Sequence, residues 1–173
     1  MTEAQGSPQD PVDAITAQWF AVRPDLETGP MAVFGRIWRI ETAMAARMEK
    51  TYGRYGLSRG EFDVLATLRR AGEPYTLSPR RLATTMMLTT GGMTGRLDKL
   101  EKAGLLHRSP DPDDRRALRV TLAERGIRLI DEAVAAGLEV QAEVIGAALD
   151  EEQVRQLNDL LRPLLLGATG QTP

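Results

Sequence analysis

The stretch of residues 78–126 constrains the fold of this chain more than any other part. Ser78-Pro79 supplies a helix cap followed by proline at the first helical position. A second helical segment begins at residue 89 or 90 and ends at Gly104, and two short strand-like segments, 105–110 and 117–120, then flank the charged loop DPDDRR. This order of elements is typical of a winged helix-turn-helix, which places one helix in the major groove of DNA and a basic loop in the minor groove.

The composition excludes several classes of protein. The chain has 173 residues, enough for one domain with its own core. It has no cysteine and a single histidine, His107, which excludes disulfides, cysteine-ligated zinc, thiol redox sensing and histidine-based catalytic clusters. The N-terminus lacks the apolar run of a signal peptide, and no segment approaches the roughly 20 apolar residues that span a bilayer. We therefore expect a cytoplasmic protein that is not an enzyme and needs no cofactor or metal.

The net charge of −2 conceals an uneven distribution of charge along the chain. Residues 54–120 hold thirteen basic and eight acidic side chains, a net charge of +5. Residues 1–30 carry a net charge of −4 and residues 121–173 a net charge of −5. The positive charge therefore coincides with the predicted winged helix, where DNA phosphates would need it. Chance clustering of solvated charges is the alternative.

Most of the remaining sequence predicts helices, over residues 11–21, 30–52, 58–72, 121–149 and 150–166. Capping boxes are expected to begin three of them, at Ser58 with Glu61, Thr121 with Glu124, and Asp150 with Gln153. The expected fold is mainly α, a winged helix-turn-helix with a two-stranded β-wing and N- and C-terminal dimerisation helices. We divide the chain into a disordered tail (1–10), N-terminal helices on the dimer and ligand side (11–53), the winged helix-turn-helix region (54–120), C-terminal dimerisation helices (121–166) and a second disordered tail (167–173).

The two C-terminal helices carry more apolar side chains than one small winged helix can cover. Leu129, Val134 and Leu138 belong to the first, and Leu157 and Leu160 to the second. This surplus favours a homodimer in which terminal helices of two chains interleave, although an ordinary helical core is the alternative. A twofold dimer would present two reading helices roughly 34 Å apart to a pseudo-palindromic site.

The predicted reading helix is unusually rich in glycine. On a helical wheel, Met93, Leu97 and Leu100 form its buried stripe, and glycines lie on the opposite face. Glycine in a helix costs about 1 kcal/mol relative to alanine, a cost that close approach to the floor of a major groove would explain. A poorly formed helix or close packing on a neighbour is the alternative. The residues that we expect to contact DNA here and in the flanking segments are Ser78, Arg80, Arg81, Thr89, Thr90, Gly91, Gly92, Thr94, Gly95, Arg96, Lys99, Arg115 and Arg116.

The loop between the predicted strands carries Asp114, Arg115 and Arg116. An arginine held on a hairpin can enter a narrow minor groove and read its width rather than its sequence. Asp114 would aim such an arginine by pairing with it. A solvated mixed-charge turn is the alternative for this loop.

Residues 57–126 resemble the MarR family of dimeric winged-helix regulators. The resemblance rests on the motifs LSRGEFDVLATLRRAG, TTGGMTGRLDKLEKAGLLHR and DPDDRRALRVTLAERG, and it extends through both terminal helices. It implies an obligate homodimer that binds double-stranded DNA, represses nearby genes and leaves the DNA when a small, usually anionic aromatic ligand binds.

The N-terminal segment AITAQWFAVRPDLE resembles the added helix of the urate-responsive branch of that family. The resemblance implies a urate site made of Trp19, Asp63, Arg96 and Arg108. An aromatic face for stacking and arginine forks for bidentate hydrogen bonds suit a purine anion. Each residue also has an ordinary interpretation: Trp19 as a packing anchor, Asp63 as a solvated surface carboxylate, and the two arginines as phosphate contacts.

Three other functions remain open at this point. A regulator of the same family could respond to a phenolate or to no ligand. An architectural protein would bind any DNA broadly and with strong salt dependence. A winged helix can also serve as a protein–protein module, which the glycine-rich face and the wing arginines argue against.

Overall fold

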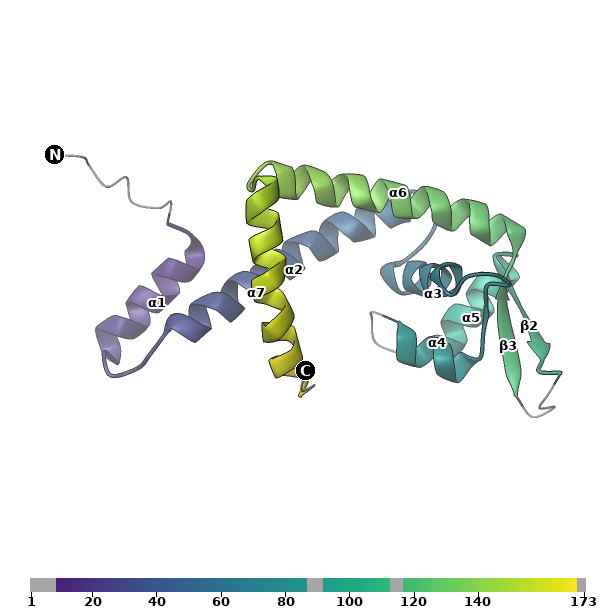
Figure 1. Cartoon of the computed structure of the whole chain (residues 1–173), viewed down its shortest axis with the longest axis horizontal. Helices are drawn as coiled ribbons and strands as arrows, with labels where there is room; N and C mark the ends of the chain where they lie inside the picture. The colour runs from purple at the N-terminus through teal and green to yellow at the C-terminus, as the bar shows by residue number, and fades with distance from the viewer. Residues whose placement is uncertain (1–8, 87–91, 113–116, 171–173) are drawn as a thin grey trace. The chain divides into compact units, whose positions relative to one another are not determined.

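The computed structural model describes residues 9–86, 92–112 and 117–170, which form a mainly helical fold with a small antiparallel sheet (Figure 1). The prediction of a mainly α winged helix is confirmed. In chain order, the elements are α1 (Pro11–Val22), α2 (Gly29–Gly53), α3 (Arg59–Arg70), β1 (Thr76–Leu77), α4 (Pro79–Thr85), α5 (Met93–Lys102), β2 (Leu106–Pro110), β3 (Leu118–Leu122), α6 (Glu124–Gly146) and α7 (Glu151–Thr169).

The chain divides into two compact units, Met1–Arg47 and Met48–Pro173. In the first unit, α1 is joined to α2 by charge and by close packing. The guanidinium of Arg36 donates a hydrogen bond of 2.7 Å to Asp10 and also forms an ion pair with Asp13. The same two carboxylates form the capping box at the N-terminus of α1. Val12 is buried and packs closely on Gly35, because a Cβ added to Gly35 would lie 3.2 Å from a methyl group of Val12.

The second unit contains the winged helix. Its sheet has the order β1-β3-β2 with antiparallel neighbours, and Thr76 is paired with Thr121 at one edge. The expected wing strands are β2 and β3, and the two-residue β1 is an additional strand that sequence patterning did not indicate. The core is made by apolar side chains of α3, α4, α5, β3 and α6, among them Leu65, Leu68, Leu82, Leu100, Val120 and Ile130.

The sequence placed two helix starts wrongly. The predicted capping box at Thr121 does not form, because Thr121 belongs to β3 and its hydroxyl lies 2.8 Å from that of Thr76. Helix α6 begins at Glu124 instead, and its cap residue Ala123 makes no side-chain hydrogen bond. Helix α5 begins at Met93 rather than at residue 89 or 90, because Gly92 has φ +74° and caps the helix in a left-handed conformation.

The other two capping boxes are confirmed. Ser58 and Glu61 exchange side-chain and backbone hydrogen bonds at the start of α3, and Asp150 and Gln153 do so at the start of α7. Helix α6 leads away from the end of β3, and the chain turns at Asp150 into α7 (Figure 1). None of the residues of α7 is buried within this single chain.

Candidate nucleic-acid interface

The start of α4 presents two arginines to solvent. The hydroxyl of Ser78 accepts a hydrogen bond of 3.2 Å from the backbone N–H of Arg81, and Pro79 occupies the first turn. Arg80 and Arg81 follow in that turn, and both are exposed. The two cations at the positive end of the helix dipole suit a phosphate. Ser78 thus has a local role as the helix cap, beside the role in DNA contact that the sequence predicts.

The outward face of α5 is open. Thr94 and Gly95 are exposed, and a Cβ added to Gly95 would meet nothing within 4 Å. The same is true of Gly92, whose positive φ gives a reason for glycine there that has nothing to do with DNA. Of the glycines predicted on this face, Gly95 is therefore the described one whose presence a closely approaching surface would explain.

On α5, the two cationic residues expected to contact DNA, Arg96 and Lys99, reach toward the start of α3. The Lys99 ammonium lies 2.7 Å from Glu61, whose carboxylate is only 6% exposed. A Cβ added to Gly60 would lie 2.5 Å from Nε of Arg96, so the guanidinium occupies the space that a side chain at position 60 would need. Sequence reasoning identified Glu61 as a capping residue and missed its second role as an anchor for the reading helix.

The charge of Glu61 is maintained by its neighbours. Burial alone would raise the pKa of the Glu61 carboxyl, but the Lys99 ammonium and the backbone and side chain of Ser58 together hold that pKa below its ordinary value. A buried carboxylate that accepts hydrogen bonds from both a helix cap and a lysine of α5 fixes how α5 lies against α3.

The base of the wing is closed by an arginine–carboxylate pair. Arg119 on β3 donates to both oxygens of Asp111, at 2.8 and 3.1 Å, and Asp111 N–H bonds the carbonyl of Ala117 at 2.9 Å. Five predicted DNA contacts lie outside the described residues: Thr89, Thr90, Gly91, Arg115 and Arg116. The predicted pairing of Asp114 lies outside them as well.

Two of the four predicted ligand residues lie where α3 faces α5. Asp63 is 4% exposed, so it is not a solvated surface carboxylate. It follows Gly60 by three residues on α3 and therefore shares the helix face against which Arg96 packs. Its carboxylate also lies 4.0 Å from Nη2 of Arg70, a residue that sequence reasoning missed.

The remaining two predicted ligand residues lie on other elements. Arg108 on β2 forms an ion pair of 2.7 Å with Asp98 and donates 2.9 Å from Nε to Glu101, both on α5. Its side chain and backbone N–H hold the pKa of the Glu101 carboxyl below its ordinary value. Trp19 lies on α1 in the first unit and is 41% exposed there. The four-residue site remains a prediction.

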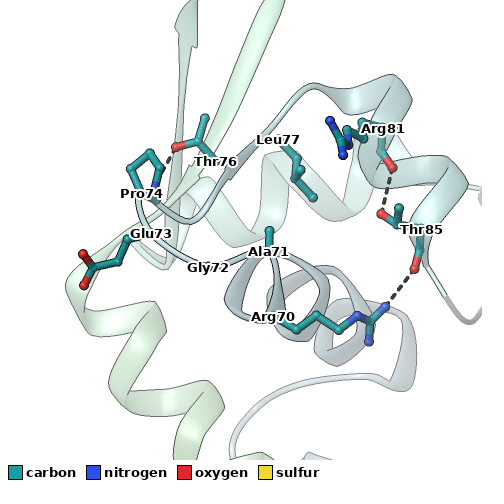
Figure 2. A pocket seen from close by; sticks show the side chains of 9 residues that line it. All are labelled: Arg70, Ala71, Gly72, Glu73, Pro74, Thr76, Leu77, Arg81 and Thr85. Atoms are coloured by element: carbon teal, nitrogen blue, oxygen red, sulfur yellow. Dashed lines mark hydrogen bonds between the residues drawn. The ribbon is translucent and has the colours of Figure 1, made fainter.

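An open hollow of about 470 Å³ lies beside these elements, between the end of α3, the turn that follows it, β1 and α4 (Figure 2). Arg70 and Arg81 contribute its cationic groups, and the side chains of Leu77 and Ala71 lie between them in the view. Across residues 9–86, 92–112 and 117–170, no helix combines the length and apolar character that a membrane-spanning segment requires.

Comparison with known sequences agrees with this architecture. The model of the MarR family matches residues 57–118. The transcriptional regulator PecS of Dickeya dadantii is 38% identical over 142 residues, which cover 82% of this chain and 86% of that protein. The transcriptional repressor YetL of Bacillus subtilis is 28% identical over 143 residues, which cover 81% of this chain and 85% of that protein.

Solved structures share the fold. AbsC of Streptomyces coelicolor superposes with a TM-score of 0.73 at 20% identity, over 84% of this chain and 98% of that one. Sco3205 of the same organism, solved in complex with DNA, superposes with a TM-score of 0.72 at 19% identity, over 82% of this chain and 89% of that one. The organohalide-sensing regulator RdhR-CbdbA1625, bound to 2,4-dichlorophenol, superposes with a TM-score of 0.69 at 18% identity, over 95% of this chain and 88% of that one.

The extent of the PecS match and the winged-helix architecture lead to one assignment. The chain belongs to the MarR family and is a DNA-binding transcriptional regulator of the PecS type.

Proposed function

We propose that this regulator is a homodimeric repressor that a small anionic aromatic ligand, with urate as the first candidate, releases from a pseudo-palindromic operator. The observation that carries the ligand part is the burial of Asp63 on the helix face against which Arg96 packs. A buried carboxylate beside an arginine of the reading helix can accept a purine N–H, while the guanidinium binds the anionic side of the ring.

The DNA part of the proposal divides the predicted contacts by role. Arg80 and Arg81 at the start of α4 bind phosphates, and Thr94 and the backbone at Gly95 face the bases. Arg115 and Arg116 enter the minor groove from the wing. Arg96 and Lys99 fix the position of α5 through α3, and a displacement of Arg96 by ligand would therefore move the reading helix itself.

The homodimer is supported by apolar side chains that this single chain leaves exposed. They lie on α1, α2, α6 and α7, and include Phe20, Trp38, Ile40, Leu138, Leu160 and Leu165. Monomeric soluble proteins rarely leave so much large apolar surface open on several helices, whereas a dimer interface covers it. The name of YetL supports a repressor, and the bound phenol of RdhR-CbdbA1625 supports an aromatic ligand.

The magnitudes set what the ligand must do. A ligand releases DNA only through its preference for the protein conformation that does not fit the operator. Moving an equilibrium from almost fully bound to almost fully released takes about 5.5 kcal/mol, or a preference of about ten-thousandfold. Two equivalent sites in a dimer would each need a preference of about a hundredfold.

The test is fluorescence anisotropy of the protein on DNA from the region upstream of its own gene, titrated with urate at fixed salt. We expect specific binding that urate reverses, and loss of that response in Asp63→Asn. Asp131→Asn is the matched control, because Asp131 is an exposed carboxylate of α6 that pairs with Arg69. If the DNA stays bound in the presence of urate but is released by 2,4-dichlorophenol, the ligand is a phenolate and not urate. Binding without preference for one sequence would favour an architectural protein.

A further inference from the structure

One guanidinium nitrogen of Arg70 contacts two residues of its own helix α3 and one residue of α4. Nη2 of Arg70 donates two hydrogen bonds of 2.8 Å each, one to the hydroxyl of Thr67 on the same helix and one to the backbone carbonyl of Thr85 on α4. The same nitrogen lies 4.0 Å from Oδ1 of Asp63. Figure 2 shows the side chain extending from the end of α3 to the end of α4.

The contact with Thr85 matters because α4 is short. It has seven residues, and Thr85 is the last of them. The last carbonyl groups of any helix lack partners within the helix and carry the negative end of its dipole. A cationic donor at this carbonyl therefore holds the end of α4 from which the chain continues to the reading helix α5.

The contact with Asp63 matters because that carboxylate is buried. The Asp63 side chain is 5% exposed and the Arg70 side chain is 45% exposed, so solvent screens their attraction at 4.0 Å in part, from the side of the guanidinium. Any event that changes the charge or the position of Asp63 therefore changes the pull on the guanidinium that holds Thr85.

We propose that Arg70 is a positioning residue that transmits the state of Asp63 to α4 and so to the geometry of the helix-turn-helix. The ligand that would alter Asp63 rests on the function proposed above, whereas the link from Asp63 through Arg70 to DNA binding requires no ligand. In this proposal, Arg70 does not itself contact DNA.

The test is a double-mutant cycle on DNA affinity without ligand, with Asp63→Asn and Arg70→Gln measured singly and together on the specific DNA site. We expect Asp63→Asn to change Kd at least fivefold with Arg70 present and less than twofold in the Arg70→Gln background. Equal fold-changes in the two backgrounds would overturn the link. The effects of two substitutions that act independently are additive in the free energy of DNA binding. The non-additive part therefore measures the coupling between Asp63 and Arg70 and not a general structural role of either residue.

Arg69→Gln is the matched control, since Arg69 is the neighbouring arginine of α3 and pairs with Asp131 on α6. Asp63→Asn should keep its full effect on Kd in that background. Thermal unfolding of each variant verifies the fold, and Asp63→Ser replaces Asp63→Asn if the amide prevents folding. The urate titration of the wild-type protein is a separate arm. If urate does not release the DNA, the proposed ligand is wrong. If the effects of the two substitutions on Kd are additive, the proposed role of Arg70 is wrong.

Discussion

At the residue scale, the identity of Gly126 is set by what lies against it. A Cβ on Gly126 of α6 would come within 2.1 Å of the carbonyl oxygen of Leu105, a backbone atom that cannot move alone. The sequence marked Gly126 as part of the segment that follows the wing, but it contained no signal for the neighbour. Which backbone a glycine faces depends on residues far along the chain, and a periodic pattern does not encode this.

Gly126→Ala is therefore expected to lower the free energy of unfolding by about 1–3 kcal/mol, the usual range for overpacking a tight site. Gly146→Ala is the control in the same helix, because a Cβ there meets nothing within 4 Å. Both substitutions gain helix propensity, up to about 1 kcal/mol, so the difference between the two variants reports the clash with Leu105. Urea unfolding followed by circular dichroism measures it. Equal stabilities of the two variants would refute the close contact.

At the element scale, the sequence predicted most helices and two of the three capping boxes because those signals are local. It failed at Thr121 because the competing partner, Thr76, lies in a strand of only two residues. It failed at the start of α5 because Gly92 adopts a left-handed conformation that a wheel drawn through the glycines cannot reveal. Both errors arise where tertiary pairing or backbone conformation overrides a local pattern.

The attachment of α5 to α3 predicts a pH dependence. The pKa of Glu61 is below its ordinary value in the folded protein, so its ionisation stabilises the fold above the ordinary carboxyl range, and this stabilisation is lost as the pH falls through the lowered pKa. Glu61→Gln should therefore cost most near pH 7, by about 1.5–3 kcal/mol for a hydrogen bond to a charged group, and progressively less toward pH 3.

Urea unfolding of wild type and Glu61→Gln across this pH range provides the measurement. Glu124→Gln is the control, because Glu124 forms an exposed pair with Arg128 within α6 and such pairs contribute about 0.3–0.5 kcal/mol. A difference between wild type and Glu61→Gln that stays constant from pH 7 to pH 3 would contradict the role of the carboxylate charge.

At the scale of the whole molecule, the fold could be predicted from the sequence, whereas the DNA contacts and the four-residue ligand site stay predictions. The sequence left open the interpretation of Asp63 as a solvated surface carboxylate. The structure buries it because α3 packs against α4, α5, α6 and β3, so more than one of its faces is covered. A helical wheel with one apolar face cannot predict the burial of a polar residue on a helix that is enclosed on several sides.

The exposed apolar side chains of α7 predict that dimerisation depends on this helix. Leu160→Glu combined with Leu165→Glu should shift the protein to a monomer and weaken operator binding, because each buried leucine contributes about 1.5–3 kcal/mol and a charge there must be desolvated. Leu160 is 71% exposed in the single chain. Gln156→Glu adds a charge to the same helix and serves as the control. Sedimentation velocity gives the oligomeric state, and an unchanged dimer would place the interface elsewhere.

The packing of Arg96 on Gly60 also limits how the protein can evolve. Because the guanidinium fills the volume of the missing side chain, a larger residue at position 60 would displace the end of the Arg96 side chain. A descendant that replaces Gly60 must therefore redirect the arginine side chain or lose it. The side chains that positions 60 and 96 tolerate are thus coupled through a contact between two helices.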